Sequence, residues 1–117
     1  MEIFVFGSNL AGRHGKGAAK DAVDLYGAEY GNGEGRQGDS YAIPTKDHYL
    51  NTLSIETIKP YINRFIHYAK ANPDLTFKVT RIGCGLAGYS DIEIAPLFVL
   101  APNNCIFDSK WVSILRQ

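Results

Sequence analysis

Short apolar runs alternate with stretches of helical periodicity along the chain, and this pattern predicts an α/β protein. Four runs have the length and composition of buried strands, at residues 3–6, 41–43, 77–82 and 105–107. Apolar residues at helical spacing predict three helices between them and a last helical turn, at residues 16–26, 55–72, 91–100 and 111–115. Because crossovers between parallel strands are right-handed, this order predicts a largely parallel sheet with helices on both faces.

Prolines and glycines set the expected boundaries of these elements. Pro44 is expected to close the second strand, and Pro60 stands inside the second helix. That helix therefore either begins near Thr57, which places Pro60 in its first turn, or kinks at the proline. Residues 29–39 carry four glycines and are predicted to form a long loop without regular structure. This loop is either a flexible connection or a lid that folds over a ligand.

The composition narrows the class of protein without identifying it. The 117 residues suffice for one domain, and 12 Lys and Arg balance 12 Asp and Glu, which argues against an extended nucleic-acid surface. The first apolar run is too short for a signal peptide or a membrane span, and the two cysteines fit neither a zinc site nor a disulfide framework. We therefore expect a single cytoplasmic domain, residues 1–117, with no membrane partner, metal or other cofactor.

The first candidate site is residues 7–19, where a strand leads through a glycine-bearing loop into a helix. Glycine lets the backbone come close to a ligand and point its N–H groups inward, and a helix N-terminus favours phosphate. Asn9 offers a donor and an acceptor to a sugar hydroxyl, and His14 is a candidate for phosphate contact or proton transfer. The alternative is a tight turn whose glycines serve only its geometry. A Walker-type phosphate loop is excluded, because Arg13 and His14 follow Gly12 where Lys and Ser or Thr are required.

The second candidate site is residues 83–89, directly after the third predicted strand. Gly83, Gly85 and Gly88 match the dinucleotide-binding fingerprint, and Asp108 lies 20 residues after the last of them. The match comes late in the chain, with only one short helix and one strand to follow, whereas nicotinamide domains begin with this unit. A dinucleotide-binding domain of the Rossmann type is therefore the weaker alternative.

Three segments, taken in this order, resemble the ligand-binding motifs of macrodomains, which bind ADP-ribose. Asn9, with the glycines and paired alanines of residues 12–19, resembles their first ligand loop, and residues 40–46 resemble the strand between the two loops. Ile-Gly-Cys-Gly-Leu at residues 82–86 is similar to the second loop, especially in the branch that removes ADP-ribose from acidic side chains. The similarity extends from about residue 2 to residue 107. It implies a three-layer macrodomain-like fold with a mostly parallel central sheet, shortened at its N-terminus by the strand whose acidic residue recognises adenine.

The same resemblance implies roles for individual residues. Asn9 would touch the distal ribose, and Tyr89 would either lie against that ribose or close the loop over it. Phe107 and Asp108 would be candidates for stacking on and bonding to adenine. Lys46 would be the catalytic nucleophile that attacks the anomeric carbon of the ribose. The implied ligand-binding residues are Gly7, Ser8, Asn9, Gly12, His14, Gly15, Lys16, Gly17, Gly83, Cys84, Gly85, Leu86, Ala87, Gly88, Tyr89 and Phe107.

Ala87 occupies the position of the aspartate that assists this lysine in the hydrolysing branch, so binding and catalysis remain two hypotheses. Losing an acid–base partner costs roughly 10²–10⁴-fold in rate. Asp47 and Asp91 are candidates to replace the aspartate, and Cys84 is either a thiolate nucleophile near a helix N-terminus or a small residue in a tight loop. The first hypothesis is a macrodomain-like module that binds ADP-ribose, a related nucleotide or an ADP-ribosylated substrate and has the option of hydrolysing it, with binding favoured over efficient catalysis. The second is a pure binding module that reads an ADP-ribosyl mark or sequesters a nucleotide signal, with Lys46 inert, and the third is an interaction protein with an empty cleft.

Overall fold

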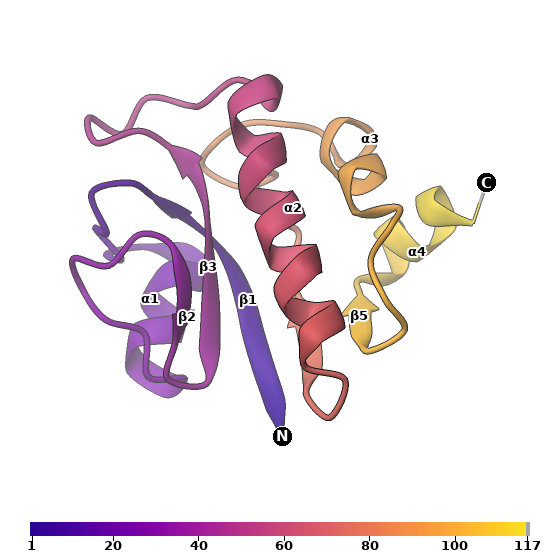
Figure 1. Ribbon diagram of the computed structural model, residues 1–117. Coiled ribbons are helices and arrows are strands. Elements are labelled where there is room, and N and C mark those ends of the chain that lie inside the picture. The colour runs from indigo at the N-terminus through magenta and orange to yellow at the C-terminus, as the bar shows by residue number, and fades with distance from the viewer. Residues whose placement is uncertain (117) are drawn as a thin grey trace.

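The structure is a computed structural model that describes residues 1–116. Within these residues, five strands form one sheet in the order β2–β3–β1–β4–β5 (Figure 1). The strands are β1 (Glu2–Asn9), β2 (Gly35–Gln37), β3 (Ser40–Lys46), β4 (Thr76–Val79) and β5 (Cys105–Phe107). The pairs β1–β3, β1–β4 and β4–β5 are parallel, and β2 runs antiparallel to β3. The predicted α/β class with a mostly parallel sheet is therefore confirmed.

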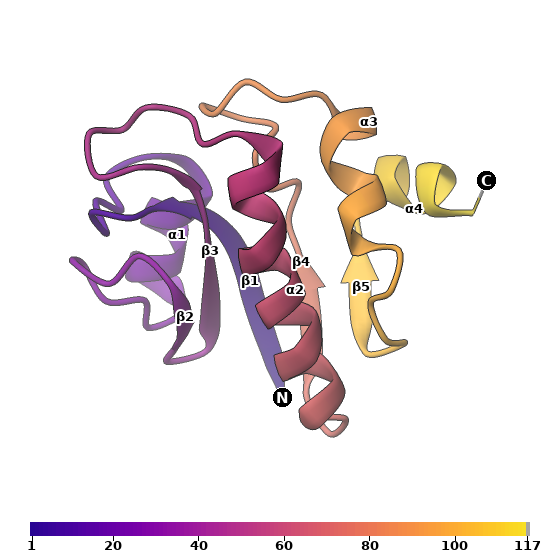
Figure 2. The ribbon, with the colours of Figure 1, turned by 45° about the horizontal axis from the view of Figure 1, so that its top comes forward.

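Helices cover both faces of this sheet (Figures 1 and 2). The helices are α1 (Gly17–Leu25), α2 (Ile55–Ala71), α3 (Asp91–Ile94) and α4 (Ser109–Leu115), and a 3₁₀ turn, η1 (Ala95–Phe98), follows α3. Side chains of β1 alternate between the faces: Ile3 and Val5 are buried with α2, η1 and α4, whereas Phe6 is buried with α1. The molecule thus has three layers, and the larger core lies on the α2 face. Within residues 1–116, none of the helices has both the length and the apolar character needed to cross a membrane.

The longest helix, α2, continues through a proline. Ser54 caps it, since its hydroxyl accepts a hydrogen bond from the Thr57 N–H at 3.2 Å. The helix begins at Ile55, so the expected start near Thr57 is wrong. Pro60 lies on the exposed face, where the carbonyl of Glu56, which loses its helical donor, can bond to water. The buried face is an unbroken apolar stripe formed by Ile58, Ile62, Phe65, Ile66 and Ala69.

The short strand β2 corrects the prediction that residues 29–39 contain no regular structure. It pairs with β3 from Gly35 opposite Ala42 to Gln37 opposite Ser40. Gly38, with φ at +58°, makes the tight turn between the two strands. A three-residue edge strand is stabilised mainly by its neighbour, so the glycine-rich sequence alone gives little sign of it.

The end of β3 also differs from the prediction. The strand runs through Pro44 to Lys46, so the expected end at Pro44 is wrong. β2 pairs with β3 only as far as Ala42, and the next bridge to β3 from outside β1 is that of Thr52 with Lys46, so Pro44 lies in the gap between them, where a missing N–H is tolerated. The extension matters for the site, because it brings Lys46 level with Asn9 at the end of β1.

Candidate functional site

A cleft of about 310 Å³ opens at the carboxyl ends of β1, β3 and β4. The two glycine-rich stretches meet there: a Cβ placed on Gly7 would lie 3.4 Å from the Gly83 nitrogen and 3.4 Å from the Ile82 Cβ. The residues of the predicted site that line the cleft are Gly7, Ser8, Asn9, Lys16, Gly17, Lys46, Gly83, Gly85, Leu86 and Ala87. The residues of the predicted site that lie outside its lining are Gly12, His14, Gly15, Cys84, Gly88, Tyr89 and Phe107. The carboxyl end of a parallel sheet is where α/β proteins place ligands.

The charge of the cleft differs from that of the whole chain. Lys16, Lys46 and Arg81 line it, whereas none of the described residues in its lining is acidic. Over the full sequence, 12 cationic residues balance 12 acidic ones. The lining therefore favours an anionic ligand. Arg81 and its neighbour Thr80 were not predicted as site residues, because the apolar pattern placed both inside a strand running to residue 82, whereas β4 ends at Val79 and leaves them at its carboxyl end.

The side chain of Asn9 is used by its own loop. Its Oδ1 accepts from the Arg13 N–H at 2.9 Å, and its Nδ2 donates to the Arg13 carbonyl at 3.0 Å. Both ends of the amide are therefore engaged in closing the turn from Asn9 to Arg13. Asn9 still lines the cleft, but in this structure its amide shapes the loop, whereas the sequence predicted a contact with a sugar.

The position of His14 corrects its expected role. The ring is 2 % exposed and packs edge-on against Phe6, with the ring centroids 5.3 Å apart. Its Nε2 lies 2.8 Å from the Asn32 carbonyl oxygen, and its buried Nδ1 has no hydrogen-bond partner in the part of the chain that is described. His14 is not part of the cleft lining, and its contacts with an aromatic ring and the backbone of another loop give it a packing role in this structure, whereas the sequence suggested a phosphate contact.

Residues 29–34 are fastened to the outside of the first loop. A Cβ on Gly12 would lie 2.2 Å from the Gly31 carbonyl carbon, and a Cβ on Gly33 would lie 2.2 Å from the Asn9 oxygen. The Ser8 hydroxyl donates to the Gly33 carbonyl, which adds a buried hydrogen bond to this contact. Backbone approaches this close require glycine and favour a fixed connection over a mobile lid.

The surroundings of Cys84 and Tyr89, two residues of the predicted site, bear on their roles in the second loop. Burial, with the Asp91 carboxylate nearby, raises the pKa of the Cys84 thiol to about 11. The thiol is therefore protonated at neutral pH, which argues against a thiolate nucleophile. The Tyr89 hydroxyl donates to the Leu53 carbonyl at 2.5 Å, and this bond ties the loop to the segment before α2.

Asp47 and Asp91, the two carboxylates considered as replacements for the missing aspartate, form hydrogen bonds with other groups of the protein. Asp47 accepts hydrogen bonds from the backbone N–H groups of Asn51 at 2.9 Å and Tyr49 at 2.8 Å, and these bonds lower its pKa. Asp91 is bonded by Arg81 and Trp111, which hold the pKa of its carboxyl well below its usual range. Both carboxylates lie outside the lining of the cleft, so the described lining residues include no carboxyl group that could assist Lys46.

A second cavity of about 230 Å³ adjoins the cleft, and Thr80 and Arg81 line both. Phe107 and Asp108, the candidates for adenine contact that the macrodomain resemblance implies, line this second cavity. The Asp108 carboxylate accepts from the Lys110 N–H at 2.9 Å and so caps α4. Among residues 1–116, no three His, Cys, Asp or Glu side chains come together as ligands for a metal ion.

Comparison with known proteins adds no relative. No protein-family model matches the sequence, and no curated protein sequence or solved structure is significantly similar to it. The candidate function therefore depends on the geometry and charge of the cleft together with the motif resemblance.

Proposed function

We propose that the cleft binds an anionic nucleotide of the ADP-ribose class. One observation carries this proposal: two side-chain-poor backbone stretches meet around a cleft whose charged lining residues, within the described chain, are all cationic. Backbone N–H groups beside glycine can reach phosphate oxygens directly, and the lysines add charge. The resemblance to macrodomain ligand loops narrows the anion to ADP-ribose or a derivative.

The start of α1 supports this placement of the phosphates. Lys16, Gly17, Ala18 and Ala19 line the cleft, so the first turn of the nine-residue helix faces it. In the described chain no side chain caps this helix, and its first turn carries no acidic residue. Its first N–H groups are therefore available to an anion, and the helix dipole favours negative charge at this end.

The second cavity extends the site in the direction that a nucleotide needs. With the diphosphate on the glycine loops, the base would enter this cavity, where Phe107 offers a ring and Asp108 an acceptor. The rival Rossmann interpretation also uses Asp108, because β5 is the parallel neighbour of β4. However, the helix after the fingerprint glycines, α3, has only four residues. This short helix favours the ADP-ribose class over a nicotinamide cofactor.

Binding is better supported than hydrolysis. An enzyme of this kind would break the bond at C1 of the distal ribose, with Lys46 as nucleophile and an acid to assist it. Lys46 lines the cleft, but the described lining residues include no carboxyl group. We therefore propose a module that binds the nucleotide with little or no turnover.

A thermal-shift panel of ADP-ribose, NAD and AMP tests the proposal. A ligand at 100 times its dissociation constant stabilises the folded chain by about 2.7 kcal/mol, which raises Tm by roughly 10 °C for a domain of this size. We expect the largest shift with ADP-ribose. A larger shift with NAD would favour the Rossmann alternative, and no shift with any of the three would leave the interaction-protein hypothesis.

Lys46→Ala separates binding from catalysis. We expect wild type and variant to release ADP-ribose from a modified glutamate peptide equally slowly. Removing one cationic contact should weaken ADP-ribose binding by about threefold to tenfold in calorimetry. Lys70→Ala, an exposed lysine near the end of α2, is the control and should change neither quantity. If wild type turns over and the variant does not, while affinity stays within a few-fold, the hydrolase hypothesis is correct instead.

A further inference from the structure

Arg81 occupies the junction of the two cavities. It follows β4, lies just before the second glycine loop, and shares with Thr80 the boundary between the cleft and the second cavity. Its side chain is 36 % exposed, so it is accessible from solvent while its position is constrained by the structure around it. A ligand that extends from one cavity into the other would lie against the residues that both share, Thr80 and Arg81.

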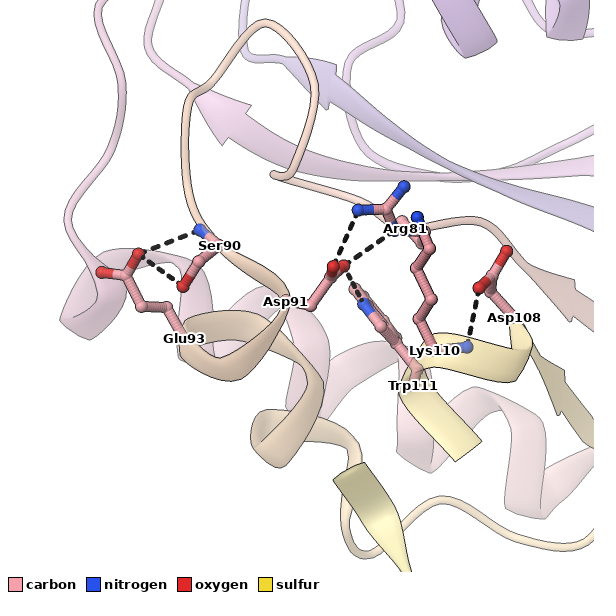
Figure 3. A network of polar contacts seen from close by, with 7 residues as sticks. All are labelled: Arg81, Ser90, Asp91, Glu93, Asp108, Lys110 and Trp111. Carbon is pink, nitrogen blue, oxygen red and sulfur yellow. Dashed lines mark hydrogen bonds and ion pairs between the residues drawn. The ribbon is translucent and has the colours of Figure 1, made fainter. Parts of the chain in front are cut away.

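A chain of hydrogen bonds fixes the orientation of Arg81 (Figure 3). Its Nε and Nη2 each donate to the Asp91 carboxylate at 2.7 Å, and the same carboxylate accepts from Trp111 Nε1 at 2.7 Å. Trp111 is fully buried, so its indole holds the carboxylate from the core side. Ser90 and Glu93 form a capping box that secures the start of α3, where Asp91 lies. The guanidinium is thus preorganised by groups that are themselves fixed.

One nitrogen of this guanidinium remains free. Within residues 1–116, Nη1 of Arg81 makes no hydrogen bond, and Figure 3 shows it pointing away from Asp91. A planar guanidinium with an unused edge suits phosphate or carboxylate oxygens. Asp91 cancels much of the charge of Arg81, so Arg81 contributes oriented donors, whereas Lys16 and Lys46 contribute net positive charge to the cleft.

We propose that Arg81 is a phosphate-contacting residue, whose free guanidinium edge binds an anionic group of the ligand where the two cavities meet, and that Asp91 is its positioning residue. This inference rests on the proposed function, because it takes the ligand to be a nucleotide that extends through both cavities. It goes further by assigning one side chain, in addition to the backbone amides, to the recognition of the phosphates.

Affinity measurements on Arg81 variants test the contact. We expect Arg81→Gln to weaken ADP-ribose binding by about tenfold or more in calorimetry, because a charge-assisted hydrogen bond is lost. Arg81→Lys keeps the positive charge but lacks the planar guanidinium with its paired N–H donors. Its affinity for ADP-ribose should lie between those of wild type and Arg81→Gln. The matched control is Arg64→Gln, which also breaks a pair with one carboxylate, that of Glu34, but lies away from both cavities. Unchanged affinity in Arg81→Gln would overturn the proposal. So would a loss accompanied by displaced amide signals of residues 83–88, because it would make the role of Arg81 structural.

A second probe keeps the result independent of the nucleotide. Inorganic pyrophosphate is titrated into wild-type protein, and the Arg81 Nε–H signal is followed by NMR. This signal is assigned by its absence from the spectrum of the Arg81→Lys variant. We expect this signal to shift while that of Arg64 stays in place; an unmoved Arg81 signal would refute the contact. If pyrophosphate shifts Arg81 but ADP-ribose does not bind, the proposed function fails and the anion contact stands. If ADP-ribose binds wild type and Arg81→Gln equally, the Arg81 contact fails and the proposed function stands.

A double-mutant cycle tests the positioning role of Asp91. We expect the penalty of Arg81→Gln for ADP-ribose binding to be at least about threefold smaller in an Asp91→Asn background than in wild type. Removing the Asp91 charge would by itself strengthen the attraction of Arg81 for an anion, so a weaker contact reports lost orientation. An unchanged or larger penalty would show that Asp91 does not position Arg81.

Discussion

Gly12→Ala is expected to lower the free energy of unfolding by about 2–5 kcal/mol, a large share of the stability of a small domain. The added Cβ would lie 2.2 Å from the Gly31 carbonyl carbon and 2.4 Å from the Asn32 nitrogen, and backbone atoms cannot rotate away as a side chain can. Gly12 also has φ at +69°, a conformation that costs a residue with a Cβ about 1–2 kcal/mol. The forced separation of the two loops adds about 1–3 kcal/mol. Urea unfolding followed by circular dichroism measures the change.

Gly15→Ala, three positions further on in the same loop, is the matched control. No atom of the described chain lies within 4 Å of a Cβ built there, and Gly15 is outside the left-handed region. We expect this variant to keep its stability or gain up to about 1 kcal/mol, because alanine restricts the unfolded chain. Equal destabilisation by both substitutions would contradict the close packing of residues 29–34 on the first loop.

The main architecture was predictable because it depends on local patterns and a few topological rules. The run from Ile3 to Phe6 has the length and composition of a buried strand, and the stripe of α2 repeats at helical spacing. Once the strands are parallel and adjacent, the loops that follow them must share one edge of the sheet. This is why the meeting of the Gly7 and Gly83 stretches could be anticipated from sequence.

The details that could not be predicted depend on tertiary partners. β2 exists because β3 lies beside it, and β3 continues past Pro44 because β2 ends earlier. His14 has the chemistry of a phosphate ligand, but its surroundings, the Phe6 ring and the Asn32 carbonyl, come from a strand and a distant loop. No local pattern signals such contacts.

The Arg81 network lies beyond sequence reasoning for the same reason. Asp91 is 10 residues from Arg81, and Trp111 is another 20 residues along the chain. Each residue taken alone has an ordinary interpretation, as a loop cation, a helix-start acid and a core aromatic. Only the packing of α3 and α4 beside β4 combines them into one fixed guanidinium.

Gly85→Val is expected to weaken ADP-ribose binding by about 100-fold or more while the fold is retained. Gly85 lines the cleft, no described atom lies within 4 Å of a Cβ placed on it, and its φ is outside the left-handed region. The valine therefore costs the free protein little, but its methyl groups fill the space through which a phosphate reaches the backbone N–H groups. Losing the contacts of one loop to the diphosphate, each charge-assisted, readily amounts to two orders of magnitude.

Calorimetry with ADP-ribose, alongside Tm of the unliganded variants, measures this effect. Ala71→Val adds the same two methyl groups at an exposed position on α2 and should bind as wild type does. Gly85→Ala, with one carbon instead of three, should lie between wild type and Gly85→Val, because the loss scales with the volume placed in the cleft. If Gly85→Val folds and binds ADP-ribose with wild-type affinity, the phosphates do not lie against the second glycine loop, and the ligand must enter the cleft from the α1 side alone.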